Sequence, residues 1–376
     1  MNEHSFIIEQ KPFLALLSSL QAICVKRTTL DVTSYILFQV NYKEIILKAT
    51  DLEISLQVSY HQETDHVTTP CTFLVQAKRL FDLVKELDGT ITCIFEDNQL
   101  HLKTDSVNVS LHVRNAQDFP PFPEKIENLI SIESSLFAEL INKVAFLIPQ
   151  NNPTVALNGL LIEISDQHLR MTATDGHCLV QVKTNKLSIA QKRKWLLPRR
   201  AIFEIKRILE SLEEPIIFLG ICGPQLVFSG TMFNFFTRLL QDTFPEYETI
   251  LNKKEFLPAR VDRQHLVKTL RRSACLLSGH FIATHFNFSE NQLAISLVNK
   301  EVGQLAENIP LESFAAVPFS MRFYAPYLLS GLQVFNDKSI TFYLAQQTRP
   351  IIFESICTEK QYEMTYLVMP VAANHQ

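Results

Sequence analysis

Hydrophobic and polar positions follow the same order of patterns three times along the chain. In each third, alternating apolar and polar positions predict a short strand, and apolar positions every three to four residues predict an amphipathic helix after it. A pair of strands, a second helix and a last group of strands complete each third. The opening strands lie at 6–9, 129–133 and 259–261, the first helices at 12–24, 136–147 and 266–277, the strand pairs at 35–58, 157–182 and 286–309, the second helices at 77–87, 199–212 and 321–332, and the closing strands at 91–113, 216–240 and 340–369.

The spacing between the thirds is regular. Asp51 and Asp175 are 175 − 51 = 124 positions apart, and Asp175 and Asn299 are 299 − 175 = 124 positions apart. Proline-containing segments at 117–124 and 241–247 end the first two thirds, because proline stops a strand. A period of this length is a whole domain, since solenoid units have about 20–50 residues. We therefore predict three domains, at 1–125, 126–252 and 253–376.

Each predicted domain combines helices with antiparallel strands. An amphipathic helix must bury its apolar face, and an antiparallel sheet offers the complementary apolar surface. The predicted fold class is therefore α+β, with three tandem copies of one helix-and-sheet domain.

Composition narrows the class of protein. Of the 376 residues, 47% are hydrophobic and 20% are charged, which is enough apolar material for several cores. The first residues are acidic, and no apolar run reaches the ~18 residues of a membrane span. The seven cysteines are scattered singly, which is typical of thiols in a reducing cytosol rather than of a disulfide framework or a zinc site. We expect a cytoplasmic protein without a membrane segment.

Basic residues gather on single faces of predicted helices. The net charge is −4, so any contact with DNA requires such local segregation. In the helix at 199–212, apolar positions form one stripe, and the helices at 77–87 and 266–277 repeat the arrangement. A shared surface lined by these helices would bind phosphates without reading bases. The basic residues are Lys78, Lys85, Arg199, Arg200, Lys206, Arg207, Lys268, Arg271 and Arg272.

The stretch at 171–180 contains Asp175, His177 and Cys178 within four positions. Neighbouring side chains on a strand point to opposite faces, so His177 and Cys178 cannot form a nucleophile and base pair. Gly176 permits a backbone conformation that other residues resist. We therefore expect a shaped turn here, and no catalytic residues.

The order and spacing of several short motifs resemble the bacterial sliding clamp family, the beta subunits of DNA polymerase III. The resemblance covers nearly the whole chain. It implies a head-to-tail homodimeric ring whose helices line a hole for double-stranded DNA, without catalysis, cofactor or metal. It also implies partners: the polymerase III catalytic subunit, the clamp loader, translesion polymerases and mismatch-repair proteins. The motifs are Ala49-Thr50-Asp51-Leu52-Glu53, Leu157-Asn158-Gly159, Thr174-Asp175-Gly176-His177, Phe244-Pro245-Glu246-Tyr247 and Tyr366-Leu367-Val368-Met369-Pro370.

The resemblance further implies a pocket between the second and third domains that takes a short glutamine- and leucine-containing peptide. Cys178 stands where the family commonly has arginine, Ala156 where it often has a large aromatic residue, and Thr154 where a basic residue is frequent. The chain also continues past Pro370 to Gln376. These departures predict a wider, less charged pocket. The implied pocket residues are Leu157, Thr174, Gly176, His177, Cys178, Leu179, Pro245, Ile250, Leu367, Met369 and Pro370.

Two further surfaces follow from the resemblance. The dimer interface would contain Val109 and Leu111 on the last long strand of the first domain, with Leu276 and Leu277 at the end of a helix in the third. The residues expected to contact DNA are Lys26, Arg27, Gln150, Asn151, Arg199 and Lys206.

Other functions remain open at this point. One is a specialised paralogous clamp with an altered set of partners. Another is a metal-dependent nuclease or phosphotransferase with Asp51, Glu53 and Asp175 as magnesium ligands. Equivalent positions of separate repeats should lie apart, however, and the five-residue spacing of His280 and His285 suits neither a helix face nor a strand face. A third is a scaffold that never meets DNA, with its basic helices facing bulk solvent.

Overall fold

The computed structural model describes residues 4–24, 30–61, 69–123, 125–211, 214–278, 281–312, 314, 317–345, 348–359 and 361–371. The chain divides into two compact units, one made of residues 1–138 and 200–239 and the other of residues 139–199 and 240–376. The middle third contributes to both units. This division arises because strands of the middle third pair with strands of the thirds on either side.

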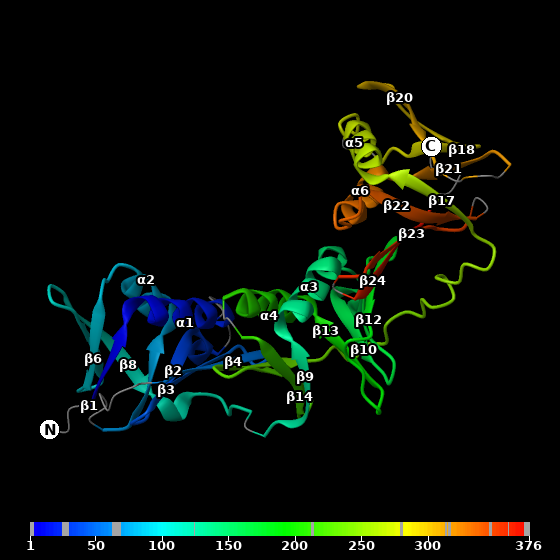
Figure 1. The fold of residues 1–376 in the computed structure, drawn as a ribbon. Coiled ribbons are helices and arrows are strands. Elements are labelled where there is room, and N and C mark those ends of the chain that lie inside the picture. The colour runs from blue at the N-terminus through cyan, green and yellow to red at the C-terminus, as the bar shows by residue number, and fades with distance from the viewer. Residues whose placement is uncertain are drawn as a thin grey trace. The chain divides into compact units, whose positions relative to one another are not determined.

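The first unit is built on one continuous antiparallel sheet with the order β1-β6-β7-β8-β5-β2-β3-β4-β16-β15-β14-β9. The helices α1 and α2 pack side by side against the strands of the first third (Figure 1). The elements are β1 (His4–Glu9), α1 (Gln10–Ile23), β2 (Tyr35–Val40), β3 (Glu44–Thr50), β4 (Ile54–His61), β5 (Cys71–Gln76), α2 (Ala77–Lys85), β6 (Thr90–Glu96), β7 (Gln99–Lys103), β8 (Asn108–Asn115), β9 (Glu127–Glu133), β14 (Ile216–Cys222), β15 (Gln225–Ser229) and β16 (Phe233–Arg238). Two helices cross the division between the units, α3 (Ser134–Val144) and α4 (Arg199–Ser211).

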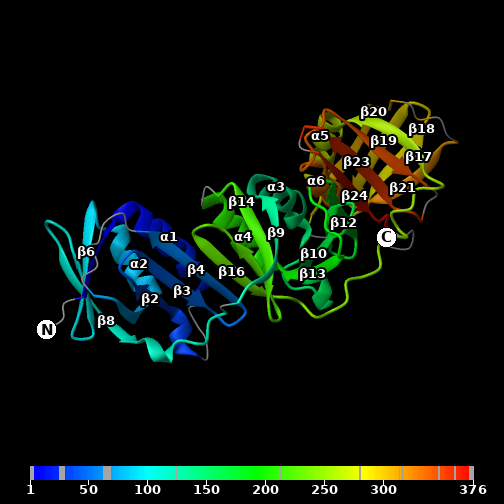
Figure 2. The same ribbon diagram turned by 60° about the horizontal axis from the view of Figure 1, so that its bottom comes forward.

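The second unit contains an eight-stranded sheet, β13-β10-β11-β12-β24-β23-β22-β17, and a four-stranded sheet, β20-β19-β18-β21. The strand β23 pairs with β22 on one side and with β24 on the other, and Figure 2 shows β23 and β24 side by side; α5 packs against α6. The elements are β10 (Gly159–Ile164), β11 (Leu169–Thr174), β12 (Cys178–Thr184), β13 (Arg193–Pro198), β17 (Leu257–Asp262), α5 (Arg263–Ala274), β18 (Thr284–Ser289), β19 (Gln292–Asn299), β20 (Gly303–Pro310), β21 (Phe319–Phe323), α6 (Ala325–Leu332), β22 (Ser339–Leu344), β23 (Ile351–Cys357) and β24 (Tyr362–Val368).

Helices cover antiparallel sheet in each third, as the alternation of periods predicts. In α1 the apolar stripe of Phe13, Leu17 and Leu20 is buried, and the ring of Phe13 meets that of Phe38 on β2 edge to face, with 6.3 Å between the centroids. Burial of such side chains supplies the main stabilisation of the fold. The α+β prediction is confirmed.

Several predicted helix boundaries are wrong. The helix α3 ends at Val144, and residues 145–147 form a tighter 3-10 turn. Residues 321–323 belong to β21 rather than to a helix, because Pro326 sets the start of α6 in its first turn. The helix α5 ends at Ala274, so Leu276 and Leu277 lie beyond it in a tighter turn. There their N–H groups donate to the carbonyls of Ser273 and Ala274.

Candidate functional site

The turn between β11 and β12 is held by the side chain of Asp175. Its Oδ1 accepts from the N–H groups of His177 at 2.8 Å and Cys178 at 2.7 Å, and the Thr174 hydroxyl donates to the Cys178 carbonyl at 2.6 Å. Gly176 has φ +94°, a left-handed conformation that glycine adopts without strain. The expected shaped turn is therefore present, and Asp175 holds it together.

This turn sets the position of the chain end beside it. The N–H of Met369 donates to the carbonyl of His177 at 2.9 Å, and Leu179 on β12 lies opposite Leu367 on β24. Leu179 and Leu367 belong to one buried cluster that also includes Ala156. Three segments that are distant in sequence therefore form one apolar surface.

A fourth segment, around Tyr247, closes the same cluster. The Tyr247 hydroxyl donates to a carboxylate oxygen of Glu163 at 2.6 Å, and Arg170 donates to the Tyr247 hydroxyl at 3.2 Å and to Glu248 at 2.8 Å. Burial, followed by the hydrogen bond to Glu163, raises the pKa of Tyr247 to about 12, so its proton stays in place at neutral pH. The N–H of Ile250 donates to the carbonyl of this anchored Tyr247 at 3.1 Å, and both Ile250 and Pro245 are exposed.

Apart from Cys178, the predicted pocket residues divide into a buried set, which we call the floor, and an exposed or half-buried set, which we call the rim; these ten together are the peptide-site residues. Each floor side chain is less than a tenth exposed, whereas Ile250 is 40% and Met369 is 36% exposed. A buried apolar floor with an exposed apolar rim suits a short peptide with large aliphatic side chains. The floor consists of Leu157, Thr174, Leu179 and Leu367, and the rim of Gly176, His177, Pro245, Ile250, Met369 and the half-buried Pro370.

Cys178 faces away from this surface. Its neighbour Leu179 points into the buried cluster, and successive strand residues point to opposite faces. Cys178 is 1% exposed. Burial, partly offset by a hydrogen bond with Tyr366, raises the pKa of the Cys178 thiol to about 12. The side chain of Cys178 is therefore packed in the core, and strand alternation alone could have indicated this.

We expect Cys178 to resist alkylation in the folded protein. With a pKa near 12, roughly one thiol in 10⁴ is ionised at pH 8, and the buried sulfur is out of reach of the reagent. Its reaction with iodoacetamide, followed by peptide mass spectrometry, should be at least about a hundredfold slower than in urea. Similar rates in both conditions would show that this sulfur is accessible.

One residue of the site was not identified from the sequence. The ring of Tyr327 on α6 stacks on the exposed His177 ring, with centroids 5.4 Å apart and an interplanar angle of 17°. The ring of Tyr324 meets Tyr327 edge to face at 5.0 Å. The residues lie 327 − 177 = 150 positions apart, so no local pattern could join them.

The predicted DNA-contacting residues have different surroundings. Gln150 and Asn151 are exposed on the loop after residues 145–147. Arg199 donates to the carbonyl of Ile148 at 2.6 Å and so holds this loop, while Lys206 is half-buried with its Nζ 3.8 Å from Glu210. Lys26 and Arg27 lie outside the described residues. Their contact with DNA stays a prediction.

Two other basic residues of α4 make contacts with the first third of the same chain. Arg200 pairs with Asp51 and donates to the carbonyl of Ile23 at 3.2 Å. Arg207 donates to the carbonyls of Ser18 at 3.2 Å and Ser19 at 3.1 Å. Ile23 is the last residue of α1, and the last carbonyls of a helix carry partial negative charge, so Arg200 stabilises this helix end, while Arg207 binds carbonyls about one turn earlier. The basic face of α4 is therefore not wholly solvent-facing.

Two of the three postulated magnesium ligands, Asp51 and Asp175, hold turns of the chain, and the third, Glu53, is exposed. Asp51 pairs with Arg200 and caps its own turn, as Asp175 caps the turn at 174–178. Within the ranges that the structure describes, no group of three or more His, Cys, Asp or Glu side chains could hold a metal ion. His280 falls outside those ranges.

The predicted interface residues are partly exposed. Val109 and Leu111 are half-buried on β8, and Leu276 and Leu277 are half-buried after α5. The nearby β20 lies at the edge of its sheet. These positions are open to contact with another molecule.

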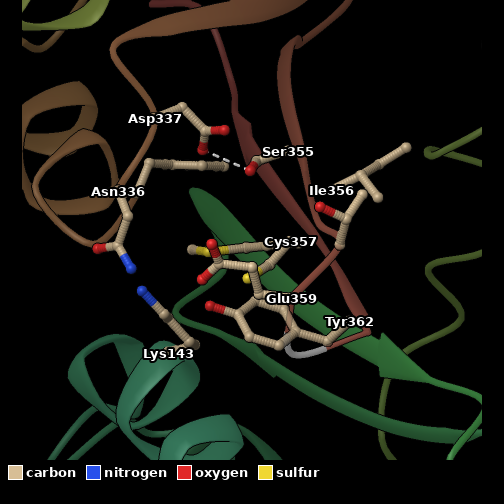
Figure 3. Close-up of a pocket in the computed structure, with 11 residues that line it drawn as sticks. Lys143, Asn336, Asp337, Ser355, Ile356, Cys357, Glu359 and Tyr362 are labelled. Atoms are coloured by element: carbon tan, nitrogen blue, oxygen red, sulfur yellow. Dashed lines mark hydrogen bonds between the residues drawn. The ribbon is translucent and has the colours of Figure 1, made fainter.

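A cavity of about 230 Å³ in the second unit is lined by none of the peptide-site residues. Figure 3 shows side chains that line it. Its polar groups mainly join protein segments. Lys143 on α3 donates to the carbonyl of Val334 at 2.7 Å, and the Tyr362 hydroxyl donates to Glu139 at 3.0 Å. Burial raises the pKa of Tyr362. The lining residues are Lys143, Phe335, Asn336, Asp337, Ser355, Ile356, Cys357, Thr358, Glu359, Tyr362 and Met364.

No helix in the described part of the chain is both long enough and apolar enough to cross a membrane.

Comparison with known protein families gives three matches in chain order, all to the DNA polymerase III beta subunit. Its N-terminal domain matches residues 4–123, its central domain residues 131–246 and its C-terminal domain residues 249–372.

Individual relatives agree with these matches. The beta sliding clamp of Pseudomonas aeruginosa is 28% identical over 372 residues, covering 97% of this chain and 99% of that protein. The crystal structure of a sliding clamp from the same organism, bound to griselimycin, has a TM-score of 0.90 at 26% identity, covering 98% of this chain and 99% of that chain. The Bacillus subtilis clamp shares the fold, with a TM-score of 0.90 at 19% identity over 99% of this chain and all of that chain.

Proposed function

Because the chain belongs to the family of DNA polymerase III beta subunits, it is a sliding clamp and a non-catalytic processivity factor, and we propose that two copies close head to tail around double-stranded DNA. A closed ring holds DNA by topology, so it needs no sequence readout and only weak contact with phosphates. We assign the domains to residues 1–125, 126–252 and 253–376.

One observation carries the ring proposal. Strand pairs join the thirds within the chain, β4 with β16 and β12 with β24. In the third repeat, β20 occupies the place of β4 and β12, and in the first repeat, β8 occupies the place of β16 and β24. Among the described strands these two are not paired with each other: β20 lies at the edge of its sheet, and residues 108–112 of β8 pair only with β7. An unpaired edge is a ready site for strand addition. We propose that β8 of one copy pairs with β20 of the other, which makes two identical seams.

The repeat relationship predicts the register of this seam. Leu74, Leu196 and Arg322 occupy the same position in the three repeats, three residues before the second helix. The carbonyl of Leu196 accepts from the N–H of Leu240, and the carbonyl of Arg322 accepts from the N–H of Val371. In the first repeat, Leu74 lies opposite Arg114. Arg114 therefore corresponds to Leu240, and five positions earlier Val109 corresponds to Phe235.

On the other strand, Leu56 pairs with Ala49, and Leu305 pairs with Leu297, which is 297 − 49 = 248 positions further on. Leu305 therefore corresponds to Leu56. Because Phe235 lies opposite Leu56, we expect Val109 to lie opposite Leu305 of the second copy.

We further propose that the peptide-site residues take the glutamine- and leucine-containing motif of partner proteins. The polymerase III catalytic subunit, the clamp loader, translesion polymerases and mismatch-repair proteins would share this site in the bacterial cytoplasm. The support is chemical, since an apolar floor and rim with few polar groups favours a short apolar peptide held in one orientation. Binding through one site makes the partners compete.

Topological binding is tested with the full chain, a clamp loader, ATP and nicked circular DNA. The protein should run as a dimer in solution, remain on the circle through gel filtration, and leave once a restriction enzyme linearises the DNA. Blocking both linear ends with bound protein should restore retention. A monomer, or equal retention on circular and open linear DNA, would contradict the closed ring.

A further inference from the structure

The first border between repeats has a polar contact beside its strand pair. Arg200 on α4 pairs with Asp51 and donates to the carbonyl of Ile23, and Arg207 donates to the carbonyls of Ser18 and Ser19 on α1. The side chain of Asp51 is only 5% exposed, so the carboxylate is shielded from water, whereas Arg200 is 40% exposed. Hydrogen bonds of this kind to charged groups are stronger than those between neutral groups.

The first repeat offers counterparts of these two cations. Both α2 and α4 start directly after a strand, at Ala77 and Arg199. Counting from these residues, Lys78 corresponds to Arg200 (78 − 77 = 200 − 199 = 1), and Lys85 corresponds to Arg207 (85 − 77 = 207 − 199 = 8). Both lysines are exposed.

The third repeat offers a changed version of the acceptors. Asn299 stands at the position of Asp51, and its amide donates to the carbonyl of Leu276 at 2.6 Å. Leu276 corresponds to Ile23, because each lies 14 positions after the residue that caps its helix, Asp262 or Glu9. In the third repeat, the carboxylate that accepts from a cation is thus replaced by a neutral amide, and this amide already donates to the carbonyl of Leu276, the counterpart of the Ile23 carbonyl.

The side chains beside the second pair of acceptors have changed more strongly. Ser18 and Ser19, nine and ten positions after the cap, correspond to Arg271 and Arg272, so the backbone carbonyls remain but the neutral side chains beside them become cationic. Glu307 pairs with Arg272, whereas Arg271 is exposed. A lysine arriving at this point meets positive charge instead of neutral serines, and like charges at this range repel.

We propose that the seam between two copies is an electrostatically weakened copy of the first intrachain border. Lys78 contacts the neutral Asn299 of the second copy, and Lys85 lies against Arg271 and Arg272 of that copy. The inference rests on the proposed ring. Lys78 can leave Asp82, its exposed partner four residues on, at small cost, because such surface pairs contribute about 0.3–0.5 kcal/mol.

The sharpest test is a substitution that tightens the dimer, because a folding defect cannot mimic a gain in affinity. Lys85→Glu replaces the repulsion by an ion pair at both seams, and the dimer dissociation constant should fall about tenfold. Sedimentation velocity over a dilution series measures this. The exposed Lys192 provides the matched control, since Lys192→Glu makes the same charge change and should leave the constant within about twofold.

A second pair of variants transplants the intrachain contact. Asn299→Asp removes the amide bond to Leu276 but places a carboxylate opposite Lys78 of the other copy, so it should tighten the dimer. Adding Lys78→Arg recreates the Asp51–Arg200 pair across the seam and should bring the gain to at least about tenfold relative to the wild type.

The outcomes separate the two proposals. A wild-type protein that stays monomeric at every concentration overturns the ring. A wild-type dimer whose dissociation constant is unchanged or raised by Lys85→Glu overturns the weakened seam and leaves the ring intact.

Discussion

Replacing Ile250 and Met369 together by glutamate is expected to lower affinity for a clamp-binding peptide by at least about a hundredfold. Both side chains are exposed apolar groups at the rim of the buried Leu179 and Leu367. Burying each against a peptide contributes about 1.5–3 kcal/mol, and a carboxylate in its place would also have to be desolvated. Fluorescence anisotropy with a labelled glutamine- and leucine-containing peptide measures the change.

The control for this experiment is Val317→Glu with Ile356→Glu. These side chains are 84% and 68% exposed and lie outside the peptide-site residues, so the charge change is the same. Both double variants should keep the wild-type thermal unfolding temperature and remain dimers. If the Ile250 and Met369 variant binds the peptide as wild type does, the peptide site lies elsewhere.

Cysteines placed at Val109 and Leu305 are expected to join two copies covalently under oxidation. Opposite residues of an antiparallel pair have Cβ atoms about 4.5–5.5 Å apart, close enough for a disulfide after a small adjustment. Most chains should then run as crosslinked dimers on non-reducing gels. Rings oxidised after loading should stay on nicked circles in high salt at least about a hundredfold longer than reduced ones, because both seams are locked.

Both cysteines are introduced into the Cys275→Ser variant, which lacks the exposed native thiol near the seam. The control pair places cysteines at Val109 and Gln304, one position out of register. Gln304 points to the opposite face of β20, so this pair should crosslink poorly. Equal crosslinking of both pairs would show that the register derived from the repeats is incorrect.

Much of the architecture could be predicted from periodicity. The order of helices and strands follows from local periodicity in the sequence, and the turns capped by Asp51 and Asp175 are local because hydrogen bonds within four residues hold them. Leu179 and Leu367 lie in one buried cluster, as strand alternation and the resemblance to sliding clamps lead one to expect. Local patterns carry this information because each element buries one face.

What could not be predicted depends on contacts between distant segments. The stacking of Tyr327 on His177 and the bonds from Arg200 and Arg207 to α1 require knowledge of which helix lies beside which turn. A basic helix face looks the same in a sequence whether it meets solvent, DNA or the end of another helix. Pro326 and the short β21 show the same limit, since an apolar run continues from strand into helix without a change in hydrophobicity.

The strand pair between β4 and β16 has a consequence for how copies add to one another. A head-to-tail contact between unlike edges closes only when the rotation per copy fits a whole turn, and otherwise it grows into an open filament. Because Leu56 and Phe235 lie opposite each other within a continuous hydrogen-bonded sheet, the first two repeats are not free to swing against each other as domains on a flexible linker would be. This fixed first border favours a single rotation at that point, and so favours closure over open polymerisation through the edges of the chain.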